Sequence, residues 1–487
     1  MSSKVIVIGA GFSGLSAASH LARLGFKVEV LEKNSLPGGR SRKLEVDGFT
    51  FDMGATWYLM PEIYQHYFSK FNKRISSFYK LKRPKPAFRL YLDENVKLDI
   101  PVELEKLYAE FEKFEPGSSK KLEYLLQKNH KKYNKAIRSV FSELNDSIFK
   151  YLNPSYYFTP SCYKASRISD HIKFFKNSKL KKILEFPEIF LGPSRFKIPA
   201  FYSLMNNSRS GLGLWYPVGG MHKIIESLEK ICYNLNVEIT YNTNVDQLDI
   251  IKGRVQSAHA RNQNFYAEYF VSSADYAYTD QKLIPDKYNN YSQSFWNKRN
   301  LSPYTLIFYI GLNKKIPQLK HHNFLLDTDL KAHSNEIYSN RNWPQSPAIY
   351  ISCPSKTDSS VAPEGCENLV AIIPVAPELE DHGKVREHYY DLLIRRLEKN
   401  IKTDIRSHVV FQKSYAHSDF SHDYNAYKGN SFGLHTGCVK PSLVNKKLPN
   451  LFYTGQSSYF GSGIPLALIN GEIIANYIFK ASGGHKS

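Results

Sequence analysis

Three glycines and one acidic residue near the N-terminus have the types and spacing that bind a phosphate-bearing nucleotide. Gly9, Gly11 and Gly14 form a G-x-G-x-x-G pattern, and Glu32 ends the next apolar run. The first glycine permits a tight turn, the second lets the backbone approach a pyrophosphate, and the third lets a helix pack closely on a strand. Glu32 can accept hydrogen bonds from an adenosine ribose. These four residues predict a dinucleotide site.

The elements that must position these residues are visible in the same stretch. Residues 5–8 are consecutive β-branched residues, which is typical of a buried strand, and residues 28–31 form a second apolar run. Between them an apolar stripe at helical spacing stops at Gly25. A strand, a helix and a strand around this glycine pattern form the βαβ unit of a parallel sheet.

A second glycine-rich segment follows closely. Gly38, Gly39 and Arg40 bring further backbone and a cation to the same pyrophosphate. The two motifs together resemble the flavoprotein family of amine oxidases, phytoene desaturases and Rab escort proteins. This resemblance implies that the cofactor is FAD, with Gly39 and Arg40 among its ligands. It also implies that Gly54 leaves room for the isoalloxazine ring.

The C-terminal part completes the resemblance. A strand over residues 451–456, a glycine-rich loop and a helix over residues 466–479 place a helix N-terminus beside an electron-rich group. In the family that group is the flavin and its pyrophosphate, and a small apolar residue packs near the adenine. The cofactor residues implied by the resemblance in these later segments are Val245, Gly455, Gln456, Gly463 and Ile464.

Further segments, in colinear order over nearly the whole chain, look like those of bacterial phytoene desaturases, which dehydrogenate carotenoid precursors. They are residues 185–187, 273–276, 355–358, 362–365 and 414–420. The chain departs from that pattern at residues 433–440 and 457–460. Both departures lie near the expected active site, so they leave the exact substrate open.

The resemblance implies an α/β fold: a Rossmann-like FAD-binding domain of the GR2 type with an inserted mixed α+β substrate- and membrane-binding domain. The FAD-binding domain is expected over residues 1–89, 215–275 and 406–487. The substrate domain is expected over residues 90–214 and 276–405.

The implied reaction is desaturation of a linear C40 carotenoid precursor, phytoene towards lycopene, with hydride transfer to flavin N5. The alternatives are a desaturase or isomerase of another carotenoid, an FAD amine oxidase, or a non-catalytic prenyl-lipid-binding protein. The electron acceptor, quinone or oxygen, stays open. We assign no catalytic side chain and no metal: His417, Asp419 and Arg195 fit structural roles equally well. Trp57 and Tyr58 either line the flavin site or belong to the core.

Charge is concentrated in one region. The 487 residues carry a net charge of +20, and residues 118–182 contain 15 basic and 4 acidic residues interleaved with aromatic ones. This composition suits an anionic membrane surface, and it also suits two solvated lysine-rich helices. No nucleic-acid-reading motif accompanies it, so we expect no nucleic-acid partner.

The N-terminus, the apolar runs and the cysteines indicate where in the cell the protein is expected. The N-terminus has no signal-peptide pattern, and no apolar run is long enough to span a bilayer. The five cysteines form no C-x-x-C pair, which fits a reducing compartment. We expect a cytoplasmic protein that lies peripherally on the inner face of the cell membrane and takes a lipid-soluble polyene from it.

Overall fold

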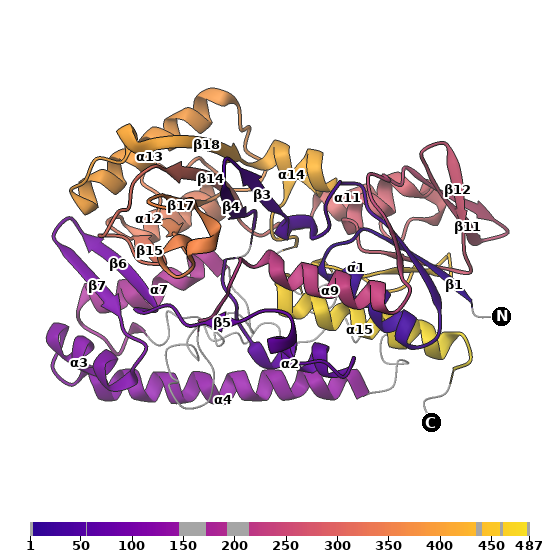
Figure 1. Cartoon of the computed structure of the whole chain (residues 1–487), viewed down its shortest axis with the longest axis horizontal. Helices are drawn as coiled ribbons and strands as arrows, with labels where there is room; N and C mark the ends of the chain where they lie inside the picture. The colour runs from indigo at the N-terminus through magenta and orange to yellow at the C-terminus, as the bar shows by residue number, and fades with distance from the viewer. Residues whose placement is uncertain are drawn as a thin grey trace.

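The computed structural model describes residues 3–54, 56–145, 172–191, 214–434, 441–457 and 461–484. A five-stranded parallel sheet carries the N-terminal motif (Figure 1). Its strands, in spatial order, are β19 (Leu451–Tyr453), β13 (Tyr269–Ser272), β1 (Lys4–Ile8), β2 (Lys27–Leu31) and β9 (Glu238–Thr240). The central strands are buried on both faces, as their continuous apolar runs predict.

Three helices pack on one face of this sheet: α1 (Phe12–Arg23), α9 (His222–Asn234) and α15 (Ile464–Ala481). Helices α1 and α15 approach closely because residue 471 is a glycine. A β-carbon there would lie 2.6 Å from the backbone nitrogen of Ala17. The other face is covered by a small antiparallel sheet of β10 (Gln247–Ile251), β11 (Arg254–Ala260) and β12 (Gln263–Tyr266). The layers confirm the predicted α/β fold.

A second, mostly antiparallel sheet of seven strands lies beside the first (Figure 1). In order, its strands are β18 (Val409–Tyr415), β14 (Tyr304–Leu312), β17 (Glu367–Val375), β16 (Ile349–Ser352), β15 (His322–Leu325), β6 (Phe88–Asp93) and β7 (Val96–Ile100). The β15–β6 pair is parallel. Helix α13 (Gly383–Ile401) packs on this sheet through Leu393 and Leu397.

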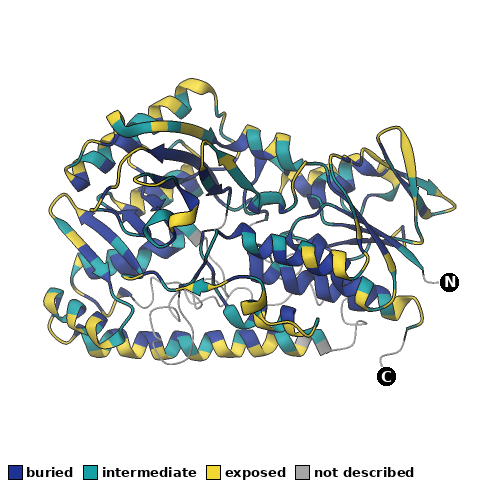
Figure 2. Ribbon diagram, viewed as in Figure 1, coloured by how far each residue is buried: buried dark blue, intermediate teal, exposed yellow. Residues whose placement is uncertain are grey.

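The longest helix, α4 (Ser118–Asn145), runs along one side of the molecule (Figure 1). Its buried residues are mostly apolar, recur at helical spacing and face the rest of the molecule, whereas its outer face is exposed (Figure 2). The exposed residues of this face are polar apart from Tyr124. It packs against α3 (Leu104–Phe114) and α15. It also shares one buried apolar cluster with α2 (Pro61–Ser69) and another with α7 (Ser178–Leu191). Within the described residues, none of the helices combines the length and apolar character that crossing a bilayer requires.

The shorter elements complete the fold. They are β3 (Lys43–Val46), β4 (Phe49–Asp52), β5 (Leu81–Lys82), β8 (Tyr216–Pro217), α10 (Tyr276–Tyr278), α11 (Gln293–Asn297), α12 (Leu330–Asn335) and α14 (His417–Tyr424). Strand β19 is shorter than the strand expected over residues 451–456 and ends at Tyr453. Strand β10 begins at Gln247. The preceding residues form a loop, which reaches the cavity described next.

Candidate active site

A cavity of about 370 Å³ opens at the carboxyl ends of the parallel strands and continues towards the seven-stranded sheet. Ligands bind at this end of parallel α/β sheets because helix N-termini and loops converge there. The N-termini of α1 and α15 both contribute to the lining. Eleven of the twelve predicted cofactor residues line this cavity: Gly9, Gly11, Glu32, Gly39, Arg40, Gly54, Val245, Gly455, Gln456, Gly463 and Ile464.

The twelfth residue, Gly14, lies behind the cavity wall. A β-carbon on Gly14 would lie 2.0 Å from the carbonyl oxygen of Gly9, so a glycine is needed for α1 to pack on the loop. A β-carbon on Gly11, in contrast, would have no atom within 4 Å. Gly11 therefore leaves room at the cavity wall, whereas Gly14 shapes the turn behind it.

Glu32 holds the first motif together from the end of β2. Its carboxylate accepts hydrogen bonds from the backbone nitrogens of Ala10, at 2.6 Å, and Asn34, at 2.9 Å. The backbone nitrogen of Gly38 donates to the carbonyl of Ala10 at 2.9 Å, which joins the two glycine-rich segments. Gly38, with φ of +113°, adopts a conformation that favours glycine.

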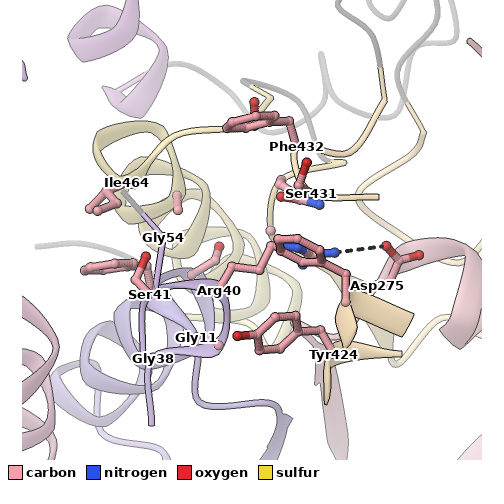
Figure 3. A pocket seen from close by; sticks show the side chains of 18 of the residues that line it. Gly11, Gly38, Arg40, Ser41, Gly54, Asp275, Tyr424, Ser431, Phe432 and Ile464 are labelled. Carbon is pink, nitrogen blue, oxygen red and sulfur yellow. Dashed lines mark ion pairs between the residues drawn. The ribbon is translucent and has the colours of Figure 1, made fainter. Parts of the chain in front are cut away.

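Arg40 is the main cationic group at the cavity wall. Its Nη2 lies 3.7 Å from Oδ2 of Asp275 and donates to the backbone carbonyl of Asn430 at 3.2 Å (Figure 3). Its guanidinium carbon lies 5.6 Å from the centre of the Tyr424 ring. Burial lowers the pKa of Arg40 and Asp275 opposes that effect, so the guanidinium stays charged.

The donors of Arg40 provide a test of whether this site suits a dinucleotide. Its buried Nε–H has no hydrogen-bond partner among the described residues. A buried donor without a partner is costly, and an anionic oxygen would satisfy it. Together with the glycine turns and two helix N-termini, this donor fits the pyrophosphate of FAD.

The C-terminal motif reaches the same cavity from α15 and β19. Gly463 caps α15 with φ of +126°, and Gly455 follows β19 with φ of +113°. The hydroxyls of Ser13 and Thr454 lie 2.5 Å apart and tie α1 to the end of β19. The helix N-terminus contributes a positive dipole end at the cavity.

The far end of the cavity is aromatic and apolar. Trp57, Ile189, Phe190 and Tyr350 line it. The Tyr350 ring centre lies 5.5 Å from that of Trp57 and 6.3 Å from that of Phe190. Our sequence analysis missed the last three of these residues, and no local pattern singles them out. The segment 185–187, which precedes Ile189 and Phe190 on α7, is the nearest signal.

The residues whose roles the sequence left open lie in different parts of the structure. Trp57 lines the cavity, whereas Tyr58 is buried in the core, stacked on Tyr64 with ring centres 4.1 Å apart. His417 and Asp419 do not line it: the His417 ring contacts the carbonyl of Ala376 at 3.2 Å, and Asp419 pairs with Arg386 at 2.8 Å. Arg195 and residues 435–440 and 458–460 lie outside the described residues.

Comparisons with known proteins identify the family of the chain. The flavin containing amine oxidoreductase family matches residues 12–479. The carotenoid 3,4-desaturase of Haloarcula japonica is 33% identical over 98% of both chains. The zeta-carotene-forming phytoene desaturase of Myxococcus xanthus is 30% identical over 97% of this chain and 93% of its own.

Solved structures share the fold at low identity. An oxidoreductase from Methanosarcina mazei has a TM-score of 0.64 at 15% identity and covers 97% of this chain and all of its own. Putrescine oxidase has a TM-score of 0.62 at 12% identity, with 99% of both chains covered. On the family match and the full-length relatives, this chain belongs to the flavin containing amine oxidoreductase family and is an FAD-dependent oxidoreductase acting on CH–CH bonds.

Proposed function

We propose that this protein is an FAD-dependent desaturase of linear carotenoids. The similarity that carries the proposal is the full-length match, at 33% and 30% identity, to two carotenoid desaturases. The aromatic end of the cavity supports it, because a polyene is long, apolar and without charged groups.

The residues of this chain bind, orient and exclude water. When bound, FAD accepts the hydride that a desaturation removes from carbon. The glycine turns and Arg40 are suited to hold the anionic part of the cofactor. Trp57, Phe190 and Tyr350 are suited to hold a polyene by ring contact, and their apolar surfaces keep water out.

We propose phytoene, converted stepwise towards lycopene, as the first substrate. A second candidate is 3,4-desaturation of an already conjugated carotenoid, favoured by the activity named for the Haloarcula japonica relative. The two candidates share the reaction and differ in the length of conjugation that the apolar end must accept. Quinone or oxygen is the proposed electron acceptor.

We also propose that α4 docks on an anionic membrane, from which the substrate is taken. Its exposed face carries Lys120, Lys131, Lys135 and Arg138. Exposed Tyr124 lies on the same face, and its ring centre is 6.4 Å from that of exposed Phe174. Basic groups attract anionic headgroups, and aromatic rings favour the interface. Residues 146–171 of the basic stretch lie outside the described residues.

We retain the domain division as a proposal. The five-stranded sheet falls entirely in the ranges proposed for the FAD-binding domain. The boundary at residue 406 places β18 with that domain, although β18 pairs with β14 in the seven-stranded sheet. We therefore propose that residues 409–415 belong with the substrate side.

The test is direct. The purified FAD-loaded enzyme is incubated with liposomes that contain either phytoene or lycopene, and the products are separated by chromatography. We expect new double bonds, seen as a shift of absorbance to longer wavelength, with at least one of the two. Turnover of putrescine or an aromatic amine, with neither polyene converted, would contradict the proposal.

A further inference from the structure

A hydrogen-bonded group of polar side chains interrupts the aromatic end of the cavity. The Tyr350 hydroxyl lies 2.9 Å from the hydroxyl oxygen of Thr56 and 2.7 Å from Nδ1 of His322. Thr56 and Tyr350 line the cavity, and His322 is fully buried behind them. Burying polar groups in an apolar wall costs free energy, and a functional role for these side chains would account for their position.

The sheet itself sets this geometry. Strands β15 and β16 are antiparallel, with His322 opposite Ser352 and Phe324 opposite Tyr350. Because alternate residues of a strand share a face, His322, Phe324 and Tyr350 lie on one side of the sheet. The ring centres of His322 and Tyr350 are 5.9 Å apart. The pair is therefore held by backbone pairing rather than by a flexible loop.

The same group extends away from the cavity. The His321 ring centre lies 4.3 Å from that of His322, and its Nδ1 lies 2.7 Å from the hydroxyl of Thr357, which is half-buried. The Nε2 atoms of both histidines have no hydrogen-bond partner among the described residues. Polar groups thus lead from the cavity wall towards the surface.

Desaturation creates a need for such a group. Each new double bond requires the loss of a hydride from one carbon and a proton from its neighbour. Loss of the hydride leaves its carbon electron-deficient and makes the neighbouring C–H bond strongly acidic, so a weak base is sufficient. Apart from Thr56, the groups named above around Tyr350, which are Trp57, Ile189 and Phe190, carry no basic atom that could accept a proton.

We propose that Tyr350 is the catalytic proton acceptor of this enzyme and that His322 is its positioning residue. The proposal rests on the desaturase function proposed above. The C–H bond breaks and its electron pair forms the new C=C bond. The proton bonds to the phenolic oxygen of Tyr350, as the phenolic proton passes to Nδ1 of His322. The hydride from the neighbouring carbon is taken by FAD, the oxidant.

The protonation states agree with these roles. Burial, with a smaller contribution from His321, lowers the pKa of His322 well below its ordinary value, so its ring is neutral and has a free lone pair. Burial raises the pKa of Tyr350 to about 12, so the phenol keeps its proton. The Tyr350 hydroxyl donates to the hydroxyl oxygen of Thr56 at 2.9 Å. A hydroxyl proton can rotate about its C–O bond, so the phenolic proton can turn from Thr56 to Nδ1 of His322, which lies 2.7 Å from the same oxygen.

The test uses the FAD-loaded enzyme and two variants. Tyr350→Phe keeps the ring but removes the acceptor, and His322→Asn keeps a hydrogen-bonding group but removes the basic nitrogen. Tyr64→Phe is the matched control, because it removes a buried hydroxyl that has no partner among the described residues and lies away from the cavity. Flavin content and polyene binding, followed by the absorbance shift of the bound polyene, should be unchanged in all three.

Product formation distinguishes a chemical from a structural role. We expect Tyr350→Phe to lower it at least about 100-fold, the usual contribution of a general base, and His322→Asn to lower it less. With phytoene deuterated at the proton-donating carbon, the isotope effect should rise in both variants. If Tyr350→Phe keeps the turnover and the isotope effect of the wild type, the role proposed for Tyr350 is wrong, and the proposed desaturase function is not affected. A wild type that converts neither phytoene nor lycopene would overturn the proposed function, and this inference with it.

Discussion

The carbonyl oxygen of Arg40 occupies the space that a side chain at residue 54 would need. A β-carbon on Gly54 would lie 1.9 Å from that oxygen. The segment that follows β4 is therefore packed directly on the turn formed by Gly39 and Arg40. This contact joins two of the predicted cofactor segments through backbone atoms, which have little freedom to move aside.

Replacing Gly54 should disturb this turn. We expect Gly54→Ala to lower the affinity for FAD about 10-fold or more, because Arg40 must shift to make room. The ratio of flavin to protein absorbance after purification measures the effect. Gly383→Ala is the control: that glycine begins α13 and has no atom near the added β-carbon. Full flavin content in Gly54→Ala would contradict the prediction.

Substitutions at Gly11 and at Gly14 should have different effects on flavin binding and on thermal stability. A valine at Gly11 has space behind it only in the cavity, so we expect a folded protein that has lost flavin. A valine at Gly14 meets the carbonyl oxygen of Gly9, so we expect lost thermal stability as well, typically by several kcal/mol. Circular dichroism melts and flavin absorbance separate the two outcomes. Equal melting temperatures for the two variants would refute this distinction.

Arg40 should contribute charge rather than packing. We expect Arg40→Met to weaken FAD binding by about 1.5–3 kcal/mol, which is roughly 10- to 150-fold, because a charge-assisted hydrogen bond is lost. Raised salt should lower the affinity of the wild type more than that of the variant. Titration of the apoprotein with FAD, followed by flavin fluorescence, gives both quantities. An unchanged dissociation constant would show that Arg40 interacts only with protein groups such as Asp275 and Asn430.

A buried charge cluster away from the cavity predicts a dependence of stability on pH. Glu472 on α15 lies 2.8 Å from Nε2 of His66 and 3.4 Å from Nζ of Lys70. Burial alone would raise the pKa of Glu472, but the hydrogen bond with His66 and the charges of His20, His66 and Lys70 lower it from 4.5 to about 2.

Because the folded pKa is below the unfolded one, this carboxylate stabilises the fold above pH 4.5, and the contribution is lost as the pH falls towards 2. We expect Glu472→Gln to cost about 2–3 kcal/mol at pH 7 and clearly less at pH 3.5. Urea unfolding at the two pH values measures the difference. If Glu472→Gln loses the same free energy of unfolding at both pH values, the loss comes from altered packing and not from the charge of Glu472.

Membrane binding should depend on the exposed face of α4. Reversing Lys120, Lys131, Lys135 and Arg138 to Glu should release the protein from anionic liposomes, since each basic group near the surface contributes about 1 kcal/mol. The matched control reverses four exposed lysines elsewhere: Lys252, Lys298, Lys315 and Lys384. Sedimentation at low and physiological salt compares them. Equal binding of the two variants would indicate that α4 is only a solvated helix.

The parts of the site whose geometry is local could be predicted from the order of the amino acids. The turn at Gly9, the close packing at Gly14 and the carboxylate at the end of β2 all lie within one βαβ unit. Their spacing sets their contacts, because the strand and helix repeats leave few alternatives. The C-terminal motif was predictable for a related reason: the carboxyl ends of parallel strands meet at one edge of a sheet.

The aromatic end of the cavity and the group around Tyr350 depend on how distant segments pack together. Thr56, His322 and Tyr350 are far apart in the chain, and they meet because of how β15 pairs with β16 and how the loop after β4 crosses that sheet. The same packing places Trp57 at the cavity wall and Tyr58 in the core. Strand register and the facing of a loop depend on packing between distant segments, which no local pattern of residue types specifies.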